Sequence, residues 1–138
     1  MLELVKSKTV PELEREADRL FSLLIRQDAA DENGIVKCCT CNKRHHWRHI
    51  HCGHFMPRQH KSTRFDRRNT GPQCCDCNTF QEGRQFQFSK YINATYGDGT
   101  AEEMLFKSKM NCKRSAFDLK YMIAEFKAEL KRKGYEIR

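Results

Sequence analysis

Residues 38–78, CCTCNKRHHWRHIHCGHFMPRQHKSTRFDRRNTGPQCCDCN, contain two Cys-x-x-Cys pairs, Cys38/Cys41 and Cys74/Cys77. Two such pairs supply the four thiolates of a tetrahedral zinc site. The adjacent Cys39 and Cys75 allow a shifted register, 39/41 with 75/77, whose one-residue gaps suit zinc less well. Four cysteines close the coordination sphere to water and substrate, so we expect a structural zinc that holds the fold.

The segment before the first cysteine pair is predicted to be a helix over residues 11–29. Its apolar residues from Leu13 to Ile25 recur on one helical face. Thr9 suits the N-cap and Pro11 is tolerated in the first turn.

Further helices are predicted after the second cysteine pair. One is expected to begin near residues 74–77 and to run towards Tyr91, with Phe80 and Phe88 facing inward. The C-terminal helices are expected over residues 100–134. Apolar positions in the last of them follow steps of three and four through two heptads. This seam has two uses, packing against the first helix or forming a homodimer, and a coiled coil ordinarily needs three or more heptads.

Length and composition indicate one α+β domain over residues 1–138, in which a zinc-bound core of residues 35–92 lies between N- and C-terminal helices. The mean hydropathy of −0.83 and the lack of a long apolar run exclude a membrane partner. The N-terminal sequence lacks the features of a signal peptide, so we expect a cytoplasmic protein. Eight Cys in a reducing compartment indicate metal ligation, and Cys52 and Cys112 are expected to be small buried hydrophobes.

Positive charge is concentrated in the middle of the chain. Residues 1–36 sum to −3, residues 37–68 to +8 and residues 69–138 to +3, and all six His lie within the middle segment. A block of this density attracts a polyanion, which predicts nucleic acid as the partner. The basic residues expected to contact phosphates are Arg58, Lys61, Arg64, Arg67 and Arg68. Trp47 is expected to be buried, or to stack on an unpaired base with the neighbouring His45 and His46.

A family resemblance rests on a series of short motifs. These are GHF (53–55), RF (64–65), Asn69 and QCCDCN (73–78), with ADRLFSLLIRQDA (17–29) upstream and a YGDG turn downstream. The series resembles the His-Me finger (HNH-like) nucleases and, more narrowly, the phage NinG/Rap recombination endonucleases. The resemblance covers about residues 10–125. It implies a treble-clef ββα-metal fold. It also implies that the protein acts in the cytoplasm of a phage-infected or lysogenic bacterial cell.

The resemblance also implies a metal-dependent DNA endonuclease acting on branched intermediates such as Holliday junctions or D-loops. His54 would be the general base, with its other ring nitrogen held by a backbone carbonyl near Asn69, and Asn69 would belong to the catalytic set. Asn78 would offer an oxygen to a catalytic Mg²⁺ or Mn²⁺. Asn69 as a turn residue and Asn78 as a helix cap are the structural alternatives.

One departure concerns position 53, where many HNH enzymes carry an Asp that binds the metal. Gly53 has no side chain to do so. His51, Asp66, Asp76 or His54 itself would then supply the second ligand. Two other functions remain open, a non-catalytic zinc-finger DNA-binding protein and a nonspecific nicking nuclease.

Overall fold

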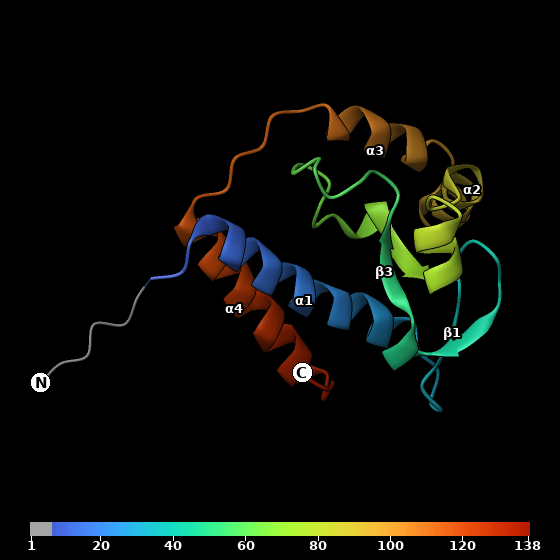
Figure 1. Cartoon of the computed structure of the whole chain (residues 1–138), viewed down its shortest axis with the longest axis horizontal. Helices are drawn as coiled ribbons and strands as arrows, with labels where there is room; N and C mark the ends of the chain where they lie inside the picture. The colour runs from blue at the N-terminus through green and yellow to red at the C-terminus, as the bar shows by residue number, and fades with distance from the viewer. Residues whose placement is uncertain (1–6) are drawn as a thin grey trace, which may run out of the picture.

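The computed structural model describes residues 7–138 and places them in four α-helices, two small antiparallel sheets and three short helical turns (Figure 1). The helices are α1 (Val10–Asp28), α2 (Gln85–Tyr96), α3 (Thr100–Ser108) and α4 (Ala116–Arg132). The strands are β1 (Ile35–Lys37), β2 (Arg44–His46), β3 (His51–His54) and β4 (Thr70–Gln73). The short turns are η1 (Trp47–His49), η2 (Arg67–Asn69) and η3 (Asp76–Phe80). The chain is therefore a mixed α+β protein, as expected.

Helix α1 lies within one residue of the predicted range at each end. Thr9 is its N-cap, and the Thr9 hydroxyl accepts a hydrogen bond from the Glu12 backbone N–H at 3.3 Å. The apolar face of the helix is fully buried, with Ala17, Leu20 and Leu24 at 0% exposure.

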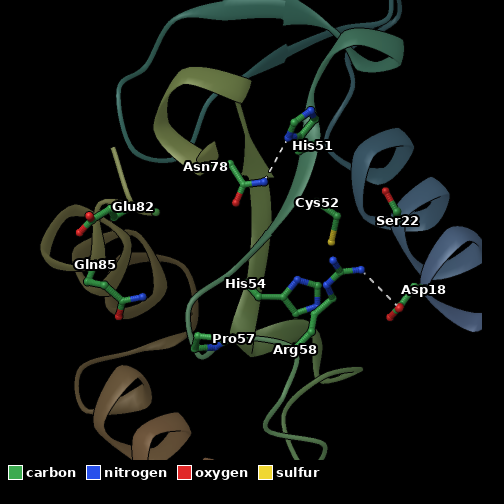
Figure 2. A pocket seen from close by; sticks show the side chains of 11 residues that line it. Asp18, Ser22, His51, Cys52, His54, Pro57, Arg58, Asn78, Glu82 and Gln85 are labelled. Atoms are coloured by element: carbon green, nitrogen blue, oxygen red, sulfur yellow. Dashed lines mark hydrogen bonds and ion pairs between the residues drawn. The ribbon is translucent and has the colours of Figure 1, made fainter. Parts of the chain in front are cut away.

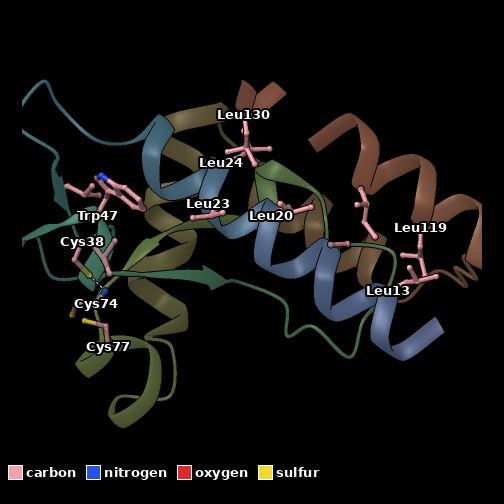
Figure 3. Packing of buried hydrophobic residues seen from close by; sticks show 14 residues of the cluster. Leu13, Leu20, Leu23, Leu24, Cys38, Trp47, Cys74, Cys77, Leu119 and Leu130 are labelled. Carbon is pink, nitrogen blue, oxygen red and sulfur yellow. Dashed lines mark hydrogen bonds between the residues drawn. The ribbon is translucent and has the colours of Figure 1, made fainter. Parts of the chain in front are cut away.

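Helix α4 packs along α1 (Figure 1). A capping box between Ser115 and Asp118 starts the helix. Leu119, Ile123 and Leu130 of α4 are buried in one core with the leucines of α1, and this core extends to the cysteine pairs (Figure 3). The apolar seam is thus used within the chain, and a homodimer would need a different surface.

The two sheets place the cysteine pairs at the ends of strands. In the first sheet Ile35 pairs with His46, and the turn between β1 and β2 carries Cys38 and Cys41. In the second sheet His51 pairs with Gln73 and His54 pairs with Thr70. Cys38 directly follows β1 and Cys74 directly follows β4. Each cysteine pair therefore begins where a strand ends.

The predicted helix from residues 74–77 to Tyr91 is wrong in its first half. The turn η3 ends at Phe80, and Glu82, Gly83 and Arg84 all have positive φ, at 52°, 83° and 45°. Left-handed residues cannot continue a right-handed helix, so α2 begins only at Gln85. Phe80, predicted to face inward, is 73% exposed.

A second core lies beneath α2 and α3. Phe88 is fully buried there, as predicted, with Phe55, Ile92, Ala101 and Met104 around it. Phe55 directly follows β3, so this core anchors the chain where the strand ends. None of the helices within residues 7–138 has the length and apolarity needed to span a membrane.

Candidate metal centre and active site

Four cysteines form the candidate metal centre. The Sγ atoms of Cys38, Cys41, Cys74 and Cys77 all lie within 4.8 Å of one another. Tetrahedral zinc with Zn–S bonds of about 2.3 Å holds its sulfurs about 3.8 Å apart, and Cys41 Sγ and Cys74 Sγ are 3.7 Å apart. The four thiolates can therefore hold a structural metal such as zinc, in the register predicted from the two-residue gaps.

Neighbouring groups orient two of these sulfurs. The Cys74 backbone N–H donates to Cys38 Sγ at 3.3 Å, and the Arg84 guanidinium donates to Cys77 Sγ at 3.2 Å. Such donors stabilise thiolates around a metal. Cys75 is exposed, and Cys39 packs in the second core beside Tyr91, so the alternative register is wrong.

A cavity of about 450 Å³ opens beside β3 (Figure 2). Its walls come from α1, from β3 and the loop after it, and from the segment between η3 and α2. The lining residues are Asp18, Ser22, His51, Cys52, His54, Pro57, Arg58, Asn78, Glu82, Gly83 and Gln85. Four of the predicted site residues thus meet at one cavity: His51, His54, Arg58 and Asn78.

The ring of His54 is oriented by one hydrogen bond. Its Nε2 lies 2.9 Å from the Arg64 carbonyl oxygen. A carbonyl only accepts, so Nε2 carries the proton and Nδ1 keeps its lone pair. The predicted carbonyl near Asn69 is thus that of Arg64. Burial lowers the pKa of His54 below its ordinary value and the charge of Arg58 acts in the same direction, while the Arg64 carbonyl opposes them. His54 is therefore neutral at pH 7.

Asn78 reaches the same cavity from η3. Its side-chain amide nitrogen lies 3.1 Å from His51 Nδ1, to which it donates, and its oxygen points into the cavity (Figure 2). The side chain therefore does not cap a helix. His51 was expected to be a metal ligand. Its Nδ1 accepts the hydrogen bond that orients Asn78.

A hydrated Mg²⁺ or Mn²⁺ would find one oriented oxygen ligand in the cavity, that of Asn78. Mg²⁺ prefers oxygen, keeps several waters and needs few protein ligands, and the oriented Asn78 oxygen is such a ligand. Within residues 7–138 the four-cysteine centre is the one cluster of three or more His, Cys, Asp or Glu ligands. Asp66 and Asp76, the other expected ligands, do not line the cavity. Asp66 instead pairs with Arg68 and Lys107.

Gly53 is explained by its neighbour on β4. A Cβ at position 53 would lie 2.3 Å from Oε1 and 2.8 Å from Cβ of Gln73, distances that real Cβ atoms do not adopt. The Gln73 side chain is fully buried and donates to Thr40 and to the Gly83 carbonyl. An Asp at position 53 has no room in this fold.

Asn69 does not reach the cavity. Its side chain is fully buried, its oxygen accepts from the Met56 N–H at 2.8 Å, and its amide donates to the carbonyls of Met56 and Thr63. These bonds brace the loop between β3 and β4. Asn69 was predicted to be part of the catalytic set, and the structure makes it a positioning residue for the loop that carries Arg64.

The five basic residues expected to contact DNA all form ion pairs within the chain. The pairs are Arg58 with Asp18, Lys61 with Glu14, Arg64 with Asp18 and Glu14, Arg67 with Asp28 and Glu129, and Arg68 with Asp66 and Glu103. Arg64 is the most enclosed, with a side chain 14% exposed and 2.5 Å from Asp18. Arg58 is 60% exposed, 3.4 Å from Asp18, and lines the cavity. Arg58 is thus the one best placed to reach a ligand there.

Sequence reasoning missed Asp18, Ser22, Glu82 and Gln85, which also line the cavity. A signal for Asp18 existed in the negative sum of residues 1–36 beside the +8 block. The structure joins the two segments through ion pairs. Trp47 is buried at 7% exposure between Arg26 and Arg48, so it does not stack on a ligand.

Fold and site together define a small α+β protein in which a four-cysteine cluster that could hold a metal lies beside a cavity lined by a His and an oriented Asn. The model of the family described as Bacteriophage Lambda NinG protein matches residues 2–136. The chain therefore belongs to the NinG family. No curated protein and no solved structure matches it significantly.

Proposed function

We propose that this protein is a metal-dependent DNA endonuclease of the His-Me finger type. The observation that carries the proposal is the state of His54, whose Nε2 is fixed by the Arg64 carbonyl and whose Nδ1 is left with its lone pair beside the cavity that receives Asn78. The order of elements supports it. Strand β3 ends in His54, β4 pairs with it, and η3 returns Asn78 to the same cavity.

The chemistry assigned to the cavity is hydrolysis of a phosphodiester. His54 Nδ1 takes a proton from water as the water oxygen attacks phosphorus, and the bond between phosphorus and the 3′ oxygen breaks. The leaving 3′ oxygen takes a proton from solvent, so the products carry a 5′-phosphate and a 3′-hydroxyl. A bound Mg²⁺ or Mn²⁺ supplies stabilisation of the charge that develops on the phosphate and the leaving oxygen. Asn78 would hold that ion, and His51 orients Asn78.

The cysteine centre has a structural part in this proposal. Its two pairs lie in a β-hairpin turn and at the start of a helical turn, an arrangement that supports a treble-clef zinc site. The centre lies next to η3, so it holds the turn that presents Asn78.

Branched DNA is the proposed substrate, since the chain belongs to the NinG family and its motifs resemble those of the NinG/Rap recombination endonucleases. A homodimer would place two cavities on a four-way junction. The deciding experiment compares cutting of a four-way junction with cutting of linear duplex, with and without added Mg²⁺ or Mn²⁺. Omitting the ion is a better control than a chelator, which would also remove zinc. A protein that cuts neither substrate with any divalent ion is a DNA-binding module instead.

Asn78→Ala is expected to slow cutting at low Mg²⁺ and to recover part of the rate at high Mg²⁺ or Mn²⁺. The substitution removes a metal ligand and leaves His54 in place. The measurement is a metal titration of the cutting rate. Asn111→Ala, at an exposed Asn outside the cavity, is the matched control. An Asn78→Ala protein with the wild-type metal requirement would contradict the assignment.

The salt dependence of DNA binding should separate Arg58 from Arg64. Arg58→Gln is expected to reduce the slope of log K against log[salt] by up to ~0.9, because one phosphate contact is lost. Arg64→Gln is expected to leave that slope unchanged and to lower the free energy of unfolding by about 2–3 kcal/mol, because it leaves Asp18 poorly paired in a largely enclosed position. Binding titrations at four salt concentrations and urea unfolding measure the two effects. The reverse pattern would show that Arg64 contacts DNA.

A further inference from the structure

Two exposed aromatic side chains flank the segment that forms one wall of the cavity. Phe80 ends η3 and is 73% exposed, and Phe86 in the first turn of α2 is 68% exposed. Between them, Glu82, Gly83 and Gln85 line the cavity. A Phe that projects into water on each side of a proposed active site has no role in the core.

The segment between the two aromatic residues is held firmly. The Gly83 N–H donates to the Cys77 carbonyl at 2.8 Å, and the Gly83 carbonyl accepts from the buried Gln73 amide at 2.8 Å. The Gln85 amide donates to the Phe55 carbonyl at 2.7 Å, and Arg84 donates to the Cys77 sulfur. Because the backbone is tied to the metal centre and to β4, little backbone freedom is lost when a ligand contacts Phe80 or Phe86.

The elements around these residues carry three cations, alongside the exposed carboxylates of Asp76 and Glu82. Lys90 Nζ lies 4.4 Å from the centre of the Phe86 ring. Lys43, on the turn between β1 and β2, and Arg44, at the start of β2, are exposed, and the four-cysteine cluster joins this hairpin to η3. Among residues 7–138 none of these three cations has a carboxylate partner, whereas every basic residue of the predicted DNA-contacting set has one. An aromatic face beside a free cation suits a nucleotide, which combines a flat base with a phosphate.

We propose that Phe80 and Phe86 stack on unpaired bases of the DNA whose backbone enters the cavity, and so select DNA with unpaired or opened bases next to the cut. This inference rests on the proposed function, because it assigns the substrate preference of the same site. Stacked bases in continuous duplex offer no free face to these side chains. Bases at a branch point or a gap do.

The test measures binding of the zinc-loaded protein without added Mg²⁺ or Mn²⁺, so that no cutting is needed. Two fluorescent DNAs serve as probes, a continuous duplex and the same duplex with a gap of three unpaired bases in one strand. Wild type is expected to prefer the gapped DNA. Phe80→Ala and Phe86→Ala should each weaken binding to gapped DNA by about fivefold or more and leave duplex binding unchanged. Phe80→Trp should keep the preference, since it keeps an aromatic ring at this position.

Phe117→Ala is the matched control. Phe117 is 77% exposed and lies on α4, which contributes nothing to the cavity. Its loss should change neither affinity. The inference is overturned if Phe80→Ala and Phe86→Ala bind gapped DNA as wild type does, or if they lose affinity for both DNAs equally. The inference and the nuclease proposal can fail independently. A protein that prefers gapped DNA through Phe80 and Phe86 but never cuts would support the inference and contradict the nuclease proposal.

Discussion

His54→Ala is expected to reduce the rate of junction cutting by about 10²- to 10⁴-fold, the usual contribution of a positioned base, while DNA affinity and zinc content stay at wild-type levels. The reason is geometric. His54 is the residue whose neutral ring is fixed through one nitrogen and open through the other. The measurement is a single-turnover rate at saturating protein beside a binding titration. His49→Ala, an exposed His outside the cavity, should cut at the wild-type rate.

The pH dependence gives a second readout for His54. A base acts when deprotonated, so the rate should fall as the pH drops through the pKa of His54. Burial sets that pKa below the ordinary His value, so the fall in rate should lie at a lower pH than the ordinary titration of His. If His54→Ala cut at the wild-type rate, the base would lie elsewhere, and His51 would be the next residue to test.

Cys74→Ser is expected to remove the bound zinc and to unfold the protein. Structural zinc sites contribute apparent binding free energies of about 10–16 kcal/mol, which appear as folding free energy. Here the cysteines are also part of the main core, since Cys38, Cys74 and Cys77 are buried with the leucines of α1. Metal analysis and a thermal melt followed by circular dichroism measure the loss.

Cys75→Ser is the matched control for this experiment. Cys75 is the next residue along the chain but is exposed and outside the four-cysteine cluster. The Cys75→Ser protein should keep one zinc and the wild-type melting temperature. A Cys74→Ser protein that melts as wild type without zinc would show that the fold does not depend on the metal.

The parts of the molecule that could be predicted from the sequence depend on local spacing. A two-residue gap between cysteines is a geometric requirement of the metal, and it selected the observed four. The 3.6-residue period and the cap at Thr9 fixed α1 to within a residue. Neither signal needs knowledge of a distant segment. His54 was predicted from the whole series of motifs that resembles the family, because Gly-His alone is a weak signal.

The parts that could not be predicted depend on distant partners. The break before α2 comes from the bonds that Gly83 makes to Cys77 and Gln73, and only Gly83 itself marks the place in the sequence. Asn69 has the residue type of a site residue, but its amide donates to buried carbonyls of the loop between β3 and β4. The sequence does not show that these carbonyls lie beside it. The ion pairs between the basic loop and the carboxylates of α1 could not be predicted either, because a sequence shows charges and not their partners.

The contact between Gly53 and Gln73 also limits how such a site can change. Any side chain at position 53 collides with Gln73, so a carboxylate can enter there only after position 73 has become smaller. A smaller residue at 73 gives up the bonds to Thr40 and Gly83 that tie the cavity wall to the metal centre. Both single steps between the two types of site therefore pass through a weakened protein. Substitutions at positions 53 and 73 should accordingly occur together, both in natural relatives with this pair of strands and in engineered variants.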